Sequence, residues 1–235
     1  MSIVILHLYP RELGINGDVG NVMALAKRAE WRGMPLTVID HEIGAALPDT
    51  VHLVHIGSGP VSAQELVHTD LLRIAATLRD WAAAGVPFLA IAGGWQLLGR
   101  SLTLDDGRIL EGAGVFPTDA VLSGARRAVE VWGDTAIDNV AGFVNYGALY
   151  HYGPLDPLMY RLGHDAGAEG ILVGDSIATN LHGPFLPMNP AWADRLLATA
   201  AARADVAMGS DDERIVRAND YAARSREAIR RRLRL

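Results

Sequence analysis

The sequence predicts an α/β protein built on a doubly wound, mostly parallel sheet with an antiparallel extension. Strand-like apolar runs alternate with helix-like segments through the first ninety residues, and glycine-rich turns follow several of the runs. The strand-like runs are continuously apolar, which is typical of parallel strands that helices cover on both faces. Strand–helix alternation of this kind favours crossover connections between parallel strands.

Each element in the first part of the chain has its own signal. Strands are predicted at residues 2–9, 35–40, 51–56 and 86–92. Asn21 can cap a helix whose apolar residues recur at helical spacing until Gly33 ends it. Helical periodicity resumes over residues 63–84.

The second part of the chain has shorter elements. Residues 120–132, 142–150 and 171–180 predict strands separated by Gly and Asp turns, and we expect them to extend the same sheet in antiparallel fashion. Residues 190–204 and 211–235 predict helices. No repeat or low-complexity linker divides the chain, so we expect one domain over residues 1–235 that ends in a C-terminal helix.

Composition restricts the function classes. The 235 residues carry a net charge of −6, which argues against a nucleic-acid partner. Cysteine is absent, so disulfides, zinc–thiolate sites and thiol catalysis are excluded for this chain. No apolar run reaches the ~18 residues of a membrane span, and the first residues lack a basic leader, so we expect a cytoplasmic protein.

The stretch "FLAIAGGWQLLG", residues 88–99, predicts a strand, a sharp turn and a helix in immediate succession. In α/β enzymes such a turn often displays a nucleophile. Ala92 stands at the point of the turn, where a Ser or Cys would be expected. The stretch therefore predicts either a catalytic elbow without its nucleophile or a tight turn in the core.

Two further turns are predicted at the carboxyl ends of strands, where open α/β sheets place their sites. They are Gly57-Ser58-Gly59 and the loop "ATNLHGPFLPMNP" around His182. Glycine turns can offer backbone N–H groups to an oxyanion, and a histidine after a strand can act as general base. The glycine motifs lack the Lys-Ser/Thr of a phosphate loop, so we expect neither a nucleotide cofactor nor a metal.

Four segments together resemble the CobB/CobQ-type glutamine amidotransferase domains, and among these the GatD-like branch. The segments are "LYPRELGINGDVGNV", "AIAGGWQLLG", "GFVNYG" and "TNLHGPFLPMNP", which occur in the order found in that family. The resemblance implies the flavodoxin-like fold of class I glutamine amidotransferases. It also implies hydrolysis of glutamine by a Cys–His pair, with transfer of ammonia to a Mur-ligase-like (MurT-type) synthetase that amidates the D-glutamate of lipid II.

The resemblance assigns roles to individual positions. Position 92 is the nucleophile position, and His182 is the general base. The expected oxyanion and glutamine-binding groups are Gly57, Ser58, Gly59, Gly93, Gln96, Arg126 and Asn145. Arg126 or Arg127 falls where the GatD-like branch carries an arginine implicated in glutamine binding, although a pair of surface arginines on a strand is an equal interpretation.

Several positions depart from the family pattern. Ala92 replaces the Cys, "GSGPVSAQ" replaces Gly-Gly-Gly-x-Asp-x-x-Gln, and Val144 and Tyr146 replace a Glu and a His. Pro184 stands where many class I members carry the third catalytic residue, a Glu that the GatD-like branch also lacks. Without a Cys this chain should be inactive as a glutaminase. Either an active site has had its Cys replaced deliberately, or the chain is a natural pseudoenzyme.

Other functions compatible with the same residues follow from these departures. The chain can be a non-catalytic binding or regulatory subunit of a ligase, a protein that holds glutamine without cleaving it, or an amidotransferase subunit for another acceptor such as a cobyrinate-like carboxylate. The basic run "SREAIRRRLRL" at the C-terminus predicts either a solvated helix end or a docking rim for the ligase.

Overall fold

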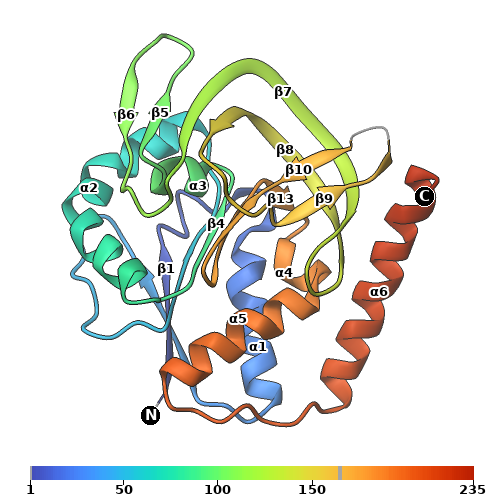
Figure 1. The fold of residues 1–235 in the computed structure, drawn as a ribbon. Coiled ribbons are helices and arrows are strands. Elements are labelled where there is room, and N and C mark those ends of the chain that lie inside the picture. Colours follow the sequence, from blue (N-terminus) through green and yellow to red (C-terminus); the bar gives the residue numbers. More distant parts are fainter. Residues whose placement is uncertain (1, 164–165) are drawn as a thin grey trace.

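The computed structural model describes residues 2–163 and 166–235, except for the side chains of Ala125 and Tyr146. Its central layer is a parallel sheet in the order β11-β12-β4-β3-β1-β2, in which β11 alone runs antiparallel to its neighbour. Figure 1 shows helices on both faces of this sheet, as expected for a doubly wound fold. The strands are β1 (Ile3–Leu8), β2 (Leu36–His41), β3 (Leu53–Ile56), β4 (Phe88–Ile91), β11 (Ile171–Val173) and β12 (Ser176–Thr179).

Helices of different parts of the chain cover the two faces. The helices are α1 (Val19–Trp31), α2 (Val61–Ala83), α3 (Gly93–Leu98), α4 (Phe185–Met188), α5 (Pro190–Arg203) and α6 (Glu213–Leu233), with a short 3-10 turn at Ile15–Gly17. Leu25 of α1 and Trp192 of α5 pack on the face of the sheet that Ile3 and Ile5 present. Leu71 of α2 packs on the opposite face.

The middle of the chain forms a second sheet, so the expectation of one extended sheet is only partly met. The pair β11–β12 is the antiparallel extension of the parallel sheet, and it divides the single strand predicted at 171–180 into a hairpin. The second sheet contains β5 (Ser101–Thr103), β6 (Ile109–Glu111), β7 (Asp119–Asp134), β8 (Asn139–His151), β9 (Met159–Arg161), β10 (Gly167–Glu169) and β13 (Leu181–His182). Its long pair β7–β8 arches over one end of the molecule (Figure 1).

One local expectation needs correction. Helix α1 begins at Val19 with Asp18 as its N-cap residue, so Asn21 lies inside the helix. The buried Asn21 side chain instead accepts a hydrogen bond from the backbone N–H of Leu186, at 2.8 Å, and joins α1 to α4.

In the part of the chain that the structure describes, no helix combines the length and apolar character needed to cross a bilayer.

Candidate active site

The elbow at Ala92 has the strained backbone expected of a nucleophile turn. Ala92 has φ 44° and ψ −101°, a region that residues with a Cβ rarely adopt. Its N–H donates to the carbonyl of Thr179 in β12 at 2.8 Å, and its carbonyl accepts from Gln96 at 2.9 Å. The next turn residue is confined as well, because a Cβ on Gly94 would lie 2.6 Å from the carbonyl oxygen of Gly57. The elbow is thus held between β12 and the turn after β3.

His182 lies at the end of β13, which pairs with β8 in the second sheet, and is completely buried. Its Nδ1 lies 2.9 Å from Oδ1 of Asp18, and its ring packs on Phe143 with ring centroids 5.5 Å apart. Among the described residues, its Nε2 has no hydrogen-bond partner. A histidine with one ring nitrogen on a carboxylate and the other unengaged has the arrangement of a general base that an acid orients.

Asp18 is the residue that sequence reasoning missed. It is fully buried at the start of α1, yet its side chain does not cap that helix. While Oδ1 meets His182, Oδ2 accepts the backbone N–H of Ser58 at 3.0 Å. Its signal in the sequence is "GINGDVGN", a motif that the family shares but that does not show that its aspartate faces a histidine.

The turn after β3 packs directly against the elbow. Gly57 has no space for a side chain, because a Cβ there would lie 2.2 Å from the carbonyl oxygen of Leu13. Ser58 is 6% exposed, and its Oγ accepts a hydrogen bond of 3.3 Å from the backbone N–H of Gly93. The N–H that follows the nucleophile position is thus engaged by the neighbouring turn.

A cavity of about 280 Å³ opens beside the elbow. Most of the residues predicted for the site line it, namely Ser58, Gly59, Ala92, Gly93, Gln96, Arg126 and Asn145. Gly57 and His182 are both buried and are not part of the lining. A cavity of this size with amide, guanidinium and backbone groups suits a small polar ligand such as an amino acid.

Polar groups around this cavity hold one another in place. Oε1 of Gln96 accepts from Nε2 of Gln64 at 3.0 Å, across the cavity wall that α2 and α3 form. Arg126 on β7 donates through Nε to Oδ1 of Asn145 on β8 at 3.1 Å. Arg126 is exposed, so its guanidinium faces both the solvent and the cavity mouth. No cluster of His, Cys, Asp or Glu suited to a metal ion occurs among the described residues.

Residues 4–190 match the CobB/CobQ-like glutamine amidotransferase domain. The chain belongs to this family. It is 32% identical over 209 residues to the lipid II isoglutaminyl synthase (glutamine-hydrolyzing) subunit GatD of Staphylococcus aureus, a match that covers 86% of each chain. It is 28% identical over 209 residues to the subunit of the same name from Streptococcus pneumoniae, covering 83% of this chain and 79% of the relative.

Solved structures agree with the assignment at the level of the fold. A crystal structure of a glutamine amidotransferase superposes with a TM-score of 0.59 at 14% identity, and covers 85% of this chain and 100% of its own. A glutamine amidotransferase from Thermotoga maritima gives a TM-score of 0.56 at 13% identity, and covers 97% of this chain and 94% of its own. The α/β architecture is thus that of the class I glutamine amidotransferases.

A second buried carboxylate supports the histidine side of this amidotransferase fold, and sequence reasoning did not find it. Glu169 of β10 accepts hydrogen bonds from the backbone N–H of Asn180 at 2.7 Å and from Oγ1 of Thr179 at 2.9 Å. Burial raises the pKa of Glu169 above its usual value, although these hydrogen bonds act in the opposite direction. Glu169 fixes the chain just before His182, from a strand that is too short to be recognised in the sequence.

Proposed function

We propose that this chain is the glutaminase-type subunit of a synthetase that amidates the D-glutamate of lipid II, and that it does not itself hydrolyse glutamine. The observation that carries the proposal is Ala92 at the strained elbow of an otherwise formed amidotransferase fold. The names of the two GatD relatives support the assignment to a lipid II isoglutaminyl synthase.

The chemistry explains why position 92 decides the activity. In a glutaminase of this family a Cys thiolate attacks the side-chain amide carbon of glutamine, and histidine protonates the departing ammonia. The Ala92 methyl group has no electron pair to donate. The His182–Asp18 pair, with Nδ1 at 2.9 Å from Oδ1, therefore has no thiol to deprotonate in this chain. Ammonia for the synthetase then has to come from solution.

A second candidate function follows from the intact cavity. Gln96, Arg126 and Asn145 still line a space of about 280 Å³ beside the elbow. A chain that keeps these groups and lacks the nucleophile can bind glutamine and leave it uncleaved, and so report its concentration to the partner. Calorimetric titration with glutamine tests this role, and R126A should weaken the binding.

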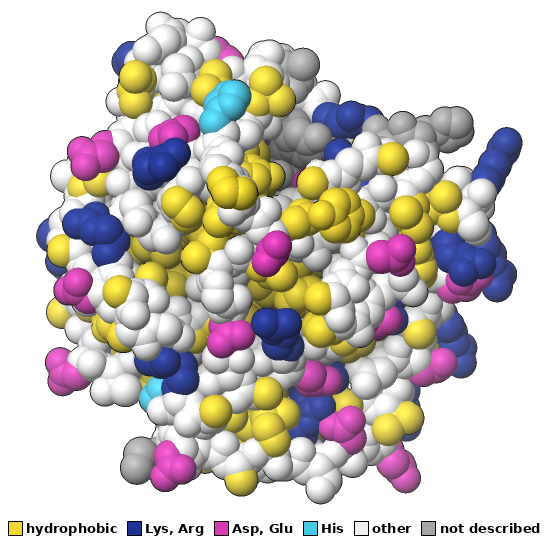
Figure 2. All heavy atoms as spheres, in the orientation of Figure 1, with side chains coloured by type: hydrophobic (Ala, Val, Ile, Leu, Met, Phe, Trp, Pro, Cys, Tyr) yellow, Lys and Arg dark blue, Asp and Glu magenta, His cyan; other side chains and the backbone are white. Residues whose placement is uncertain are grey.

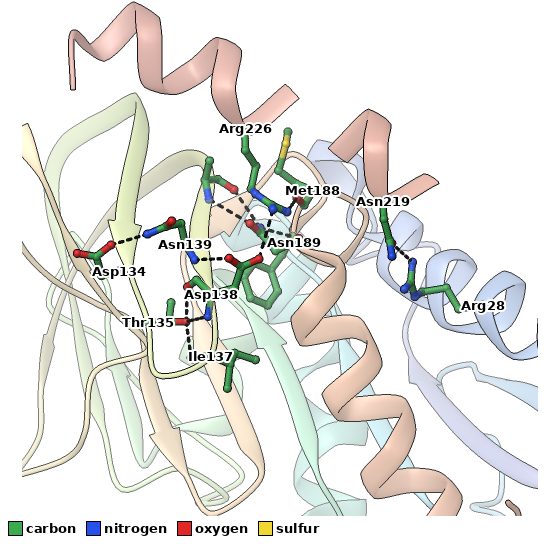
Figure 3. Close-up of polar contacts among 12 residues, drawn as sticks. Arg28, Asp134, Thr135, Ile137, Asp138, Asn139, Met188, Asn189, Asn219 and Arg226 are labelled. Atoms are coloured by element: carbon green, nitrogen blue, oxygen red, sulfur yellow. Dashed lines mark hydrogen bonds and ion pairs between the residues drawn. The ribbon is translucent and has the colours of Figure 1, made fainter. Parts of the chain in front are cut away.

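The proposed partner surface includes α6, which packs firmly on the body of the protein. Figure 3 shows Arg226 of α6 between α4 and the turn that joins β7 to β8, where it donates to the carbonyl of Met188 in α4 at 3.0 Å and to Asp138 in the turn at 3.3 Å. On the same face Arg28 of α1 donates to Asn219 of α6 at 2.9 Å (Figure 3). The helix therefore offers the partner a fixed surface.

The arginines of α6 are largely paired within the chain. Of the six arginines between positions 224 and 234, five contact Asp or Glu side chains, namely Arg224, Arg226, Arg230, Arg231 and Arg232. Figure 2 shows basic side chains gathered at the edge of the molecule where Figure 1 places α6, with acidic side chains among them. Exposed ion pairs of this kind contribute little to stability and can exchange partners. We therefore expect α6 to influence the rate of docking more than its final affinity.

Co-purification with a Mur-ligase-like protein encoded beside this chain tests the partner. The two proteins should co-elute, and the variant R224A/R231A should slow association at low salt and have no effect at high salt. R108A removes another exposed, ion-paired arginine, which lies on the β5–β6 turn, and should bind as the unchanged chain does. Equal association of all three proteins at low salt would remove α6 from the interface.

The amidation assay tests the reaction. The purified complex should amidate lipid II when ATP and ammonium are supplied. It should not do so when glutamine replaces ammonium in the presence of ATP. Amidation supported by glutamine as well as by ammonium would contradict the missing hydrolysis. Failure with both nitrogen sources would contradict the assignment to a lipid II synthetase.

A further inference from the structure

We propose that the Ser58 hydroxyl fills the oxyanion hole of this site, in the place that the carbonyl oxygen of the substrate would take. The site is then closed to amide hydrolysis at two points, Ala92 and Ser58. The inference deepens the proposed function and rests on it, because it concerns the same glutaminase-type site.

The first step is the position of the donor. In a strand-turn-helix elbow, the backbone N–H that follows the nucleophile is one of the groups that stabilise the oxyanion. Here that group is the N–H of Gly93, and it already donates to Oγ of Ser58 at 3.3 Å. A substrate oxygen would have to displace the hydroxyl to reach it.

The second step is that the hydroxyl is held in place. The N–H of Ser58 donates to Asp18 at 3.0 Å, and its carbonyl accepts from Ile15 at 3.1 Å. Only 6% of the residue is exposed. Both backbone polar groups of Ser58 are thus engaged by the loop after β1, so the turn cannot withdraw without taking a donor from the buried carboxylate of Asp18.

The third step is the close packing of the two turns. A Cβ on Gly93 would lie 3.2 Å from the backbone nitrogen of Gly59 and 3.1 Å from its carbonyl oxygen. The oxyanion hole therefore lies in a narrow gap between the turns, and the Ser58 side chain reaches into this gap. In the family pattern the residue at this position is a glycine, which leaves the gap open.

The two changes have different implications for the origin of Ala92. A deliberate Cys-to-Ala replacement would start from an active enzyme, in which the oxyanion hole is open. It would change position 92 alone, so the hole would stay open. A hydroxyl in that hole is a second change against the same reaction, at a position 34 residues earlier in the chain. This combination favours a natural pseudoenzyme over an engineered active-site variant.

The test compares three variants that all carry a Cys at position 92: A92C, A92C/S58G and the control A92C/S62G. Ser62 is an exposed residue of α2 outside the cavity lining. In each, attack by the Cys sulfur on the amide carbon of glutamine would form a thioester and release ammonia, and water would then release glutamate. We expect A92C/S58G to release ammonia about 100-fold faster than A92C, because one oxyanion donor contributes about that factor. A92C/S62G should match A92C.

A second measurement does not depend on catalysis. In the otherwise unchanged chain, S58A should shift the amide resonance of Gly93 and accelerate its exchange with solvent, whereas S62A should do neither. Equal measurable activities of A92C and A92C/S58G, or an unaltered Gly93 amide in S58A, would overturn the role of Ser58. If the Gly93 amide changes in S58A but neither A92C nor A92C/S58G releases ammonia, the proposed glutaminase-type function would be overturned instead.

Discussion

The two sides of the candidate site differ in which of the groups needed for catalysis they provide. On the histidine side, His182 and Asp18 are buried and hydrogen-bonded as an acid–base pair requires. On the elbow side, Ala92 offers no nucleophile, and the N–H of Gly93 is engaged by Ser58. The groups that would act on the carbonyl of the substrate are therefore the ones that are missing or occupied.

Packing gives the histidine side a role that does not depend on catalysis. The carboxylate of Asp18 satisfies both the imidazole of His182 and the backbone N–H of Ser58 in the interior. Loss of either partner would leave a buried polar group unsatisfied, which is costly. The pair thus has a structural role independent of hydrolysis, and its retention alone does not indicate an active enzyme.

The largest expected effect comes from breaking the histidine side. D18A removes the acceptor for two buried donors and should lower the free energy of unfolding by about 4 kcal/mol. D175A removes an aspartate that forms an exposed ion pair with Arg195, and should change it by less than about 0.5 kcal/mol. Urea titration of both variants measures the difference. A loss in D18A as small as in D175A would mean that the histidine side is kept for some reason other than stability.

A pH titration tests the core beneath the histidine side. Burial, together with the charge of His7 in the case of His55, lowers the pKa of His7 and of His55 from 6.5 to about 4. His55 lies under the site, with Nε2 3.2 Å from the carbonyl oxygen of Asp18. Because the folded state favours the neutral rings, their contribution is fully present above pH 6.5. It is lost as the pH falls from 6.5 towards 4.

Since both rings contribute, we expect the chain to lose about 5 kcal/mol of stability over this pH interval. Urea midpoints at pH 7.5 and pH 4.5 measure the loss. H7N replaces one ring with a side chain that takes up no proton, and should reduce the loss, whereas H151N, at an exposed position, should not. A loss of the same size in H7N and the unchanged chain would place the pH sensitivity elsewhere.

A smaller effect is expected at the elbow. Ala92 has φ 44°, which strains a residue with a Cβ, and A92G should relieve that strain. The strain energy exceeds the entropic cost of ordering a glycine, so A92G should stabilise the fold by about 1 kcal/mol. A90G makes the same change two residues earlier, in the regular strand β4, and should destabilise it by about 1 kcal/mol. Thermal melts of the two variants should therefore move in opposite directions. A fall in melting temperature for both would mean that the elbow is not strained.

The sequence predicted the parallel sheet well because its signals are local. Continuous apolar runs ending in glycine turns indicated β1, β3 and β4, and the glycines at the elbow marked the sharp turn at Ala92. The second sheet was assigned to the first because strand patterns do not specify which strands pair. That choice depends on contacts such as that of β5 with β7, which only the folded chain establishes.

The candidate site was harder to predict from the sequence, because it too depends on contacts between residues that are far apart in the chain. Asp18 and His182 are 164 residues apart and meet only because β1 and β12 end at the same edge of the sheet. The position of Ser58 was recognised as a departure from the glycine pattern. The direction of its hydroxyl depends on its contact with the N–H of Gly93 in the elbow, which no local pattern predicts.

Release of ammonia from glutamine tests the central claim most directly. The unchanged chain, with and without the proposed ligase partner, is incubated with glutamine carrying ¹⁵N in the side-chain amide, and labelled ammonium is followed by NMR. Our account predicts no release above the rate without protein, because position 92 lacks a nucleophile and Ser58 occupies the oxyanion hole. Labelled ammonium that appears with the unchanged chain and disappears in H182A would contradict it.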